Sequence, residues 1–382
     1  MFIHLICAAR PNFMKIAPLY HALKGHDWAQ VSIVHTGQHY DVNMSDVFFR
    51  DLRLPNPDIH LGVGSGTHAE QTGKVMMAYE KVIFEQRPDV VIVAGDVNST
   101  LACSLAAVKV NLADGTRNLK KPRPVVVHLE AGLRSFDRSM PEEINRIVTD
   151  ALSDLLLTPS KDADEHLIRE GIAREKIVRV GNIMIDSLEM LRKRIESLDT
   201  YRSFGLSPMK YGLVTLHRPA NVDNSQNLLK ICEALVEIGK VLHLVLPLHP
   251  RTRKNLSAWG LLKRLEEADG LKVLEPLPYA EFMNLVFNSA LVITDSGGIQ
   301  EETTYLGIPC LTLRPNTERP ITLELGTNQL CKIEQLVDKV KEAISQPLRK
   351  KCEIEFWDGK TALRIVECLK TRFVDSEDGH TG

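Results

Sequence analysis

The chain alternates between short apolar runs and longer segments in which apolar residues recur at helical spacing. Unbroken runs of valine, isoleucine and leucine are typical of strands that a parallel sheet buries on both faces. The longer segments, such as 71–85 and 227–239, have the apolar spacing of helices that cover such a sheet. In the first half, the expected strands are Phe2–Ala9, Val31–Thr36, Val90–Ala94, Val125–Leu129 and Leu155–Thr158.

The same series of strand and helix occurs a second time. In the second half, the expected strands are Gly212–Leu216, His243–Leu248, Val273–Leu274, Leu291–Thr294 and Pro309–Leu313. This repeated alternation predicts an α/β protein with two Rossmann-like, doubly wound domains. We expect an N-terminal domain over 1–180 and a C-terminal domain over 181–357. Ligands of open parallel sheets bind at the carboxyl ends of the strands, so polar residues that directly follow a strand are the candidates for function.

Composition excludes several classes of partner. Lys+Arg 47 against Asp+Glu 49 gives a formal net charge of -2, so no basic field attracts nucleic acid. No apolar stretch reaches the roughly 18 residues that a membrane span needs. The 7 cysteines contain no C-x-x-C pair, which argues against a disulfide framework or a zinc ribbon. We therefore expect a cytoplasmic protein without a nucleic-acid, membrane or metal partner.

Acidic residues gather after two strands of the first half. Asp96 and Glu130 directly follow these strands, while Glu142 and Glu143 stand where the next helical segment begins. Each alone has a structural explanation, because acidic residues cap helices and are favoured in a first turn. Together at one sheet edge they predict acid/base chemistry, since carboxylates in different surroundings can hold different pKa values.

Cationic and small residues predict an anion site. Arg10 and Lys15 flank the start of the helix after the first strand, where free N–H groups favour an anion. In the second half, Ser296, Gly297 and Gly298 stand at a strand-to-helix junction, where small residues let a phosphate approach backbone N–H groups. A tight turn with a serine cap explains the same three residues structurally.

Three further residues extend this second-half group. His217 follows the strand 212–216 beside an arginine, which suits phosphate contact or proton transfer. Arg319 is another candidate cation, and Glu302, one turn into its helix, suits a ribose hydroxyl pair. No complete G-x-G-x-x-G, P-loop or metal-ligand spacing occurs, so neither a dinucleotide nor a metal cofactor is expected.

At these residues the sequence resembles the UDP-N-acetylglucosamine 2-epimerase family, of the non-hydrolysing type. The resemblance covers nearly the whole chain. It rests on Ala9-Arg10-Pro11 with Lys15, the Gly95-Asp96 loop, HLEAGLRS (128–135), PEEINR (141–146), LHR (216–218), TDSGGIQEE (294–302) and TERP (317–320).

The resemblance implies a glycosyltransferase-B-like fold, in which two Rossmann-like domains face a central cleft and a C-terminal helix, about 358–374, packs back on the first domain. It implies inversion at C2 of UDP-N-acetylglucosamine to give UDP-N-acetylmannosamine. Members of the family carry this out by anti elimination of UDP to 2-acetamidoglucal and re-addition of UDP. The resemblance also implies a UDP-N-acetylhexosamine as ligand, no cofactor and a homodimer.

Residue by residue, the resemblance implies catalytic roles for Asp96, Glu130, Glu142 and His217. Among the substrate-binding residues that it implies, Glu302 would hold the ribose and Phe282 would pack on the uracil. The full set of implied substrate-binding residues is Arg10, Lys15, Arg134, Arg146, Phe282, Ser296, Gly297, Gly298, Glu302 and Arg319. Which carboxylate is the base and which the acid stays open.

Other readings of the sequence remain open at this point. A hydrolysing 2-epimerase would share the elimination step but release UDP and free N-acetylmannosamine. An epimerase of another UDP-2-acetamido sugar, or a glycosyltransferase with an acceptor, would use the same fold. A UDP-sugar-binding regulator would need the phosphate clamp but not Asp96, Glu130 and Glu142, so the carboxylates favour an enzyme.

Overall fold

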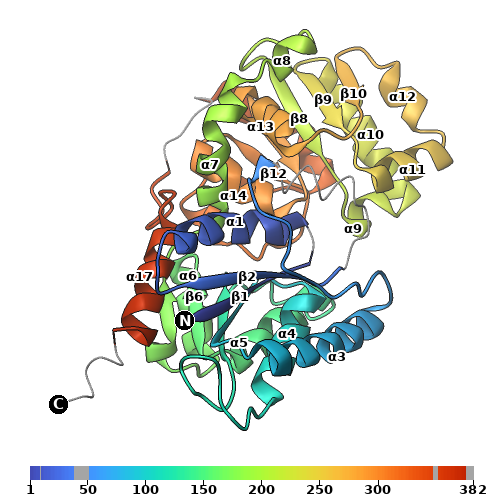
Figure 1. Ribbon diagram of the computed structural model, residues 1–382. Coiled ribbons are helices and arrows are strands. Elements are labelled where there is room, and N and C mark those ends of the chain that lie inside the picture. The colour runs from blue at the N-terminus through green and yellow to red at the C-terminus, as the bar shows by residue number, and fades with distance from the viewer. Residues whose placement is uncertain (9, 38–50, 347–351, 376–382) are drawn as a thin grey trace. The chain divides into compact units, whose positions relative to one another are not determined.

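The computed structural model describes residues 1–8, 10–37, 51–346 and 352–375 (Figure 1). Contacts within the chain divide it into two compact units, which are treated separately below. Unit 1 comprises Met1–Met190 and Glu355–Gly382, and unit 2 comprises Leu191–Ile354. The first division falls inside helix α7 (Ile183–Ser197), whereas the sequence pattern placed it at 180/181.

The described part of unit 1 contains a sheet of 7 strands, every neighbouring pair of which is parallel, in the order β3-β2-β1-β4-β5-β6-β7. The strands are Phe2–Cys7 (β1), Gln30–His35 (β2), Ile59–His60 (β3), Val90–Ala94 (β4), Val125–Leu129 (β5), Leu155–Thr158 (β6) and Ile177–Arg179 (β7). Every residue of β1, β4, β5 and β6 is buried, which explains why these runs show no polar alternation.

Helices cover this sheet on both faces, and Figure 1 shows α1 on one face with α3 and α4 on the other. The helices of unit 1 are Arg10–Lys24 (α1), His68–Gln86 (α3), Asn98–Lys109 (α4), Pro141–Leu152 (α5), Lys161–Arg169 (α6), the short 3-10 helix Arg174–Lys176 (η1), the start of α7, and Thr361–Phe373 (α17). The C-terminal helix α17 packs on α1, and the Asp186 carboxylate accepts the backbone N–H groups of Thr361 and Ala362 at 3.1 and 2.8 Å. These bonds satisfy N–H groups at the start of the helix.

The described part of unit 2 contains a sheet of 6 parallel strands in the order β10-β9-β8-β11-β12-β13. The strands are Tyr211–Thr215 (β8), His243–Pro247 (β9), Leu271–Leu274 (β10), Leu291–Thr294 (β11), Cys310–Thr312 (β12) and Asn328–Leu330 (β13). Strand β10 begins earlier than expected because Leu271 and Lys272 pair with Leu244 and Val245 of β9.

Helices also cover the second sheet, with a buried apolar cluster between the sheet and helices α10 and α16. The helices are the rest of α7, Thr200–Ser203 (α8), Pro219–Val222 (α9), Ser225–Gly239 (α10), Pro250–Ala258 (α11), Leu262–Glu266 (α12), Tyr279–Asn288 (α13), Gly297–Leu306 (α14), Ile321–Glu324 (α15), Ile333–Gln335 (η2, 3-10) and Leu336–Ser345 (α16). The predicted α/β fold with two parallel sheets is confirmed. Within the described ranges, no helix is long and apolar enough to cross a membrane.

The strand orders locate the candidate site in each unit. In both sheets the order reverses in the middle, between β1 and β4 in unit 1 and between β8 and β11 in unit 2. Connections leave such a point toward opposite faces, so a crevice opens at the carboxyl ends of the two strands. The loop Gly95–Asp96 follows β4, and His217 and Asp295 lie shortly after β8 and directly after β11.

Candidate active site

In unit 1, a buried ion pair lies at the carboxyl end of the sheet. Lys15 Nζ, from α1, contacts Glu130 Oε2, from the loop after β5, and only 8% and 4% of the two side chains is exposed. Gly95 passes close by, because a Cβ at this position would lie 2.6 Å from Lys15 Nζ and 3.4 Å from Glu130 Oε2. A glycine is therefore required here for the loop after β4 to cross the ion pair.

Asp96 is the more accessible carboxylate of this group. Its Oδ2 contacts Arg146 Nη1, and 33% of its side chain is exposed. Its backbone carbonyl accepts the Asn145 amide at 2.8 Å. Arg146 in turn donates from Nη2 to Glu143 Oε2 at 2.6 Å. Helix α5 thus fixes Asp96 through two neighbouring residues, while part of the carboxylate stays open to a ligand.

The adjacent pair Glu142 and Glu143 have different surroundings. Glu143 is buried and accepts the backbone N–H groups of Ser135 and Phe136 at 3.0 and 2.8 Å. Burial raises the pKa of Glu143, but the Ser135 and Arg146 hydrogen bonds outweigh it and leave that pKa below the usual value. Glu143 therefore fixes the loop before α5, whereas Glu142 is half-buried and is the member of the pair that a ligand can reach.

Arg134, an implied substrate-binding residue, is buried in this structure. Its side chain is 1% exposed, and Nη2 lies 2.7 Å from Asp150 Oδ2 and 2.6 Å from Glu170 Oε2. Nη1 also donates to the Leu133 carbonyl at 2.8 Å. These contacts hold the loop after β5 in place, and the implied substrate contact of Arg134 stays a prediction.

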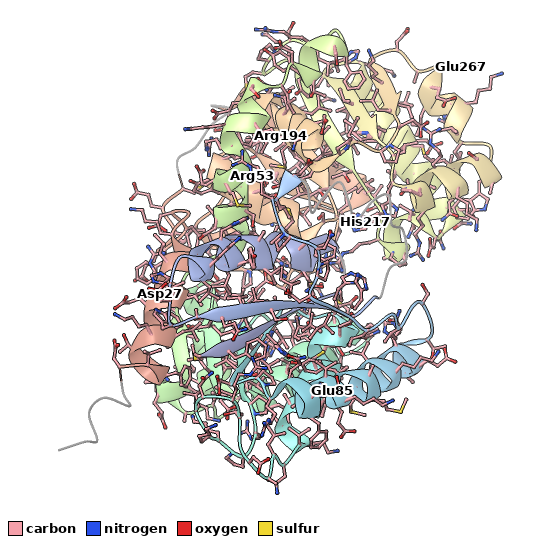
Figure 2. The ribbon with its side chains drawn as sticks, viewed as in Figure 1. Asp27, Arg53, Glu85, Arg194, His217 and Glu267 are labelled. Atoms are coloured by element: carbon pink, nitrogen blue, oxygen red, sulfur yellow. The ribbon has the colours of Figure 1, made fainter. Side chains whose placement is uncertain are left out.

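In unit 2, His217 and Asp295 meet where the strand order reverses. His217 Nδ1 lies 3.1 Å from Asp295 Oδ1, with 38% of the histidine side chain and 0% of the aspartate side chain exposed. Figure 2 shows His217 on the loop that leads into α9. Burial raises the pKa of Asp295, but hydrogen bonds from His217 and Asn221 lower it below the usual value. The carboxylate is therefore ionised at neutral pH.

A cluster of three arginines lies beside the N-terminus of α14. Arg319 Nη1 and Arg314 Nη2 contact the Glu318 carboxylate at 2.6 and 2.8 Å, and Arg218 Nη2 lies 3.6 Å from it. Burial raises the pKa of Glu318, yet the charges of Arg319 and Arg314 hold it well below its usual value. A Cβ at Gly297 would lie 2.6 Å from Arg319 Nη1, so the cluster reaches the first residue of α14.

This cluster combines cations with the start of a helix. Arg319 Nε also contacts Glu301 Oε1 at 2.8 Å, and the charge of Asp295 acts on Arg218, so three guanidinium groups face three carboxylates. Because these charges balance, the free N–H groups at the N-terminus of α14 are the feature that favours an anion. Ser296 caps this helix by position, and a Cβ at Gly298 would meet no atom within 4 Å. The junction that the sequence singled out is therefore open at Gly298.

Glu302 and Phe282 lie on neighbouring elements of unit 2. The Tyr279 hydroxyl, at the start of α13, donates to Glu302 Oε1 at 2.6 Å, and Glu302 is buried. Phe282 is half-buried on the same helix. Arg10 begins α1, but its side chain lies outside the described residues.

The expected residues therefore form two groups. Unit 1 brings together Lys15, Asp96, Glu130 and Arg146, and unit 2 brings His217 and Arg319 beside the start of α14. The sequence analysis gave no separate role to Asp295, Glu318, His128 or Asp150. Asp295 was detectable, because it directly follows a buried strand. In the described residues, no group of at least 3 His, Cys, Asp or Glu side chains could hold a metal ion.

Comparisons with known proteins agree over the whole chain. A family model described as UDP-N-acetylglucosamine 2-epimerase matches residues 21–370. A UDP-N-acetylglucosamine 2-epimerase of Methanocaldococcus jannaschii is 42% identical over 97% of this chain and 99% of its own. A Pseudomonas aeruginosa protein named UDP-2,3-diacetamido-2,3-dideoxy-D-glucuronate 2-epimerase is 39% identical over 97% and 99%. A crystal structure of a Methanocaldococcus jannaschii UDP-GlcNAc 2-epimerase with UDP-GlcNAc and UDP superposes with a TM-score of 0.85 at 42% identity, covering 97% and 100% of the two chains.

Proposed function

Because the chain belongs to the UDP-N-acetylglucosamine 2-epimerase family, we propose that it inverts C2 of UDP-N-acetylglucosamine to give UDP-N-acetylmannosamine. The observation that carries the proposal is the carboxylate group of unit 1. A partly exposed Asp96 lies on the loop that crosses the buried Lys15–Glu130 pair. A protein that only bound a UDP-sugar would need the cations of unit 2 but no such set of acids.

The reaction proceeds in two half-reactions. In the first, a carboxylate removes the C2 proton, the electron pair of that bond forms the C1–C2 double bond, and the C1–O bond breaks so that UDP leaves with its electrons. In the second, a carboxylic acid protonates C2 from the opposite face, and a UDP phosphate oxygen re-forms the bond to C1. We assign these proton transfers to Asp96, Glu130 and Glu142 as a set.

The carboxylates also act through their charge. Positive charge develops at the sugar ring as the C1–O bond lengthens, and preorganised carboxylates stabilise it. Lys15 keeps Glu130 in one position during this change. Glu130 stands in the left-handed region of the backbone, with φ 72, a conformation that is rare outside glycine and is common at functional sites.

We assign the UDP moiety to unit 2. The diphosphate is bound by Arg319 and by the N-terminus of α14 with Ser296, Gly297 and Gly298, and His217 contacts the same diphosphate. Glu302 accepts the ribose hydroxyl groups and Phe282 packs on the uracil. The family resemblance adds Arg10, a residue of unit 1, as a further cation for the diphosphate. The N-terminus of α14, which Arg319 of the cluster reaches at Gly297, supports this division of roles.

A second candidate substrate follows from the Pseudomonas relative. That protein is named for a UDP-2,3-diacetamido-2,3-dideoxyglucuronate, and its identity to this chain is 39%, close to the 42% of the archaeal relative. The sugar of this second substrate carries a carboxylate and another acetamido group. The two substrates therefore differ in charge at the sugar, and a parallel assay with both decides between them.

The experiment is an incubation of the purified protein with UDP-N-acetylglucosamine in D2O, followed by proton NMR. We expect UDP-N-acetylmannosamine with deuterium at C2, because the proton exchanges with solvent-derived deuterons on the carboxylates. Release of UDP and free N-acetylmannosamine would instead identify a hydrolysing enzyme. If UDP-N-acetylglucosamine stays unchanged and takes up no deuterium at C2, while the diacetamido sugar is turned over, the second substrate is the correct one.

We further propose that the protein acts as a homodimer. This follows from the family resemblance, and sedimentation at the assay concentration tests it. A monomer that is fully active would contradict the proposal.

A further inference from the structure

The carboxylate of Asp295, in unit 2, accepts several hydrogen bonds. The backbone N–H of His217 lies 3.1 Å from each of its oxygens, and the backbone N–H of Arg218 lies 2.9 Å from Oδ2. The Asn221 amide donates to Oδ2 at 2.9 Å. The side chain of Asp295 is fully buried, so water does not replace these partners. The carboxylate therefore fixes the whole turn between β8 and α9.

The same carboxylate also determines where the His217 ring carries its proton. An ionised carboxylate can only accept hydrogen bonds, so the ring nitrogen that faces it must donate. That nitrogen is Nδ1, at 3.1 Å from Oδ1. We assign the proton to Nδ1 from this network. In the neutral ring Nε2 is then the acceptor, and in the charged ring Nε2 is a second donor.

The exposed fractions of the two side chains show which edge of the His217 ring is accessible. Asp295 is wholly buried, while 38% of His217 is exposed, so the ring edge away from Asp295 is the one that a ligand can meet. Arg218 turns back into the protein, where its Nε donates to the Asp295 carbonyl at 3.0 Å and Nη2 lies 3.6 Å from Glu318. The His249 ring, at the start of α11, lies 5.4 Å from the His217 ring, measured between ring centroids.

We propose that Asp295 is a positioning residue that keeps His217 protonated at Nδ1 and so directs Nε2 at the diphosphate. The inference rests on the proposed function, which gives His217 its diphosphate contact. Asp295 touches no substrate; it acts through the ring. When the ring is charged, Nε2–H donates a hydrogen bond to a diphosphate oxygen as UDP departs. The arrangement is analogous to a triad aspartate that orients a histidine.

The decisive variant is Asp295→Asn, which keeps the shape of the side chain and one acceptor oxygen. Its amide group presents a donor as well, so a carboxamide N–H facing Nδ1 would move the ring proton to Nε2. We expect kcat to fall about a hundredfold or more, the usual scale for a misplaced proton-transfer group. The dissociation constant for UDP should change little in comparison, because Arg319 and the N-terminus of α14 are untouched.

The direct readout is the nitrogen NMR spectrum of the full chain with labelled histidine, in which the ring signals of His217 are assigned from a His217→Gln spectrum. We expect the Nδ1–H form in the unchanged protein and the Nε2–H form in Asp295→Asn. A matched control is Asn221→Ala, which removes another Asp295 partner without touching the ring. It should leave the tautomer of His217 as it is.

The outcomes separate this inference from the proposed function. If no UDP-sugar is epimerised but the tautomer changes as expected, the function fails and the positioning by Asp295 stands. If the enzyme turns over and the tautomer of Asp295→Asn is that of the unchanged protein, the positioning fails. Should Asp295→Asn not fold, an Nε2–H form in the unchanged protein would overturn the inference on its own.

Discussion

The ring of His128 and the carboxylate of Asp150 form a buried pair, with Nδ1 at 2.5 Å from Oδ1. The other ring nitrogen, Nε2, lies 2.8 Å from the Gly95 carbonyl oxygen. Burial raises the pKa of Asp150, but its contacts with His128 and Arg134 lower it below the usual value. The His128 ring therefore links Asp150 to the loop that carries Asp96.

We predict that His128→Ala lowers stability and activity together. The change removes the buried ring that contacts both Asp150 and the Gly95 carbonyl. Leaving a buried polar group without its hydrogen-bond partner costs about 1–3 kcal/mol. Urea unfolding should show a loss of that order. Activity should also fall in the folded protein without urea, because the loop that carries Asp96 loses its His128 contact at Gly95.

The matched control is Glu170→Gln. Glu170 is the outer partner of Arg134, and 34% of its side chain is exposed. Arg134 keeps its contact with Asp150 in this variant, so we expect a smaller loss of unfolding free energy than in His128→Ala. If Glu170→Gln and His128→Ala lose equal free energy of unfolding, the contacts of His128 are no more important for stability than that of Glu170.

We predict that Glu130→Gln retains UDP binding but loses at least about a hundredfold in kcat, the usual scale for one positioned proton-transfer group. Apart from Arg10, the residues that we assign to the diphosphate lie in unit 2, so UDP affinity measured by calorimetry should stay within a few-fold. Near-normal turnover would remove Glu130 from the mechanism. Conversely, lost UDP binding would show that Glu130 acts on the nucleotide.

We predict that Lys15→Met lowers the free energy of unfolding. It leaves the Glu130 carboxylate buried without its cation, and an uncompensated buried charge costs about 3–5 kcal/mol. The double variant Lys15→Met with Glu130→Gln should recover part of that stability, because the neutral amide needs no cation. A double-mutant cycle from urea unfolding measures this coupling. Additive losses would mean that the two side chains do not stabilise each other.

The pair Gly297→Ala and Gly298→Ala tests the anion site of unit 2. A Cβ at Gly297 would lie 2.6 Å from Arg319 Nη1 and 2.7 Å from Glu318 Oε1, so the arginine cluster must shift. A Cβ at Gly298 meets nothing within 4 Å, and alanine in a helix gains about 0.5–1 kcal/mol over glycine. Gly297→Ala should therefore lower the unfolding free energy, while Gly298→Ala should not.

Both glycine variants should weaken UDP binding if a phosphate approaches the start of α14. Gly298→Ala is the informative one, because its fold is undisturbed. A loss of UDP affinity in that variant, measured by calorimetry, would place the phosphate at this helix. Unchanged affinity would show that the diphosphate binds elsewhere.

The sequence predicted the central strands of both sheets because burial on both faces leaves an unbroken apolar run. Val90–Ala94, Val125–Leu129, Leu155–Thr158 and Leu291–Thr294 have the expected bounds. The strands that pattern reasoning missed are β3, β7 and β13, each of 2 or 3 residues at a sheet edge. Short edge strands such as Ile59–His60 and Asn328–Leu330 are stabilised by pairing with one neighbour, which a hydrophobic pattern does not reveal.

Site prediction relied on position along the chain. Asp96 and Glu130 directly follow strands, and strand ends converge at one edge of a parallel sheet. It did not identify residues that act through another side chain. Nothing in the sequence distinguishes Glu142 from Glu143, or shows that Arg134 faces Asp150. Those assignments depend on which face of a helix or loop is buried, and only the packed structure supplies it.

The pH dependence of stability should reveal a neutral histidine in the core of unit 1. Burial, with the nearby charge of Arg117, lowers the pKa of His4 from 6.5 to about 3. Its Nδ1 lies 3.1 Å from the Tyr79 hydroxyl. As pH falls below about 6.5, the unfolded chain binds a proton at His4 and the folded protein does not. The free energy of unfolding therefore decreases as the pH is lowered, by at most about 1.4 kcal/mol per pH unit for this residue.

The pKa of His35 is lowered to about 4, also by burial first and by His60 second, so His35 adds to the same slope. Urea unfolding between pH 7 and pH 5 isolates these histidines, because free carboxyl groups titrate near pH 4. The variant His4→Gln cannot take up this proton, so its stability should change less steeply over that window. The stability of each protein is compared with its own value at pH 7, so a general destabilisation by the substitution does not alter the slope. An unchanged slope in His4→Gln would show that His4 is protonated in the folded protein or does not contribute to the loss.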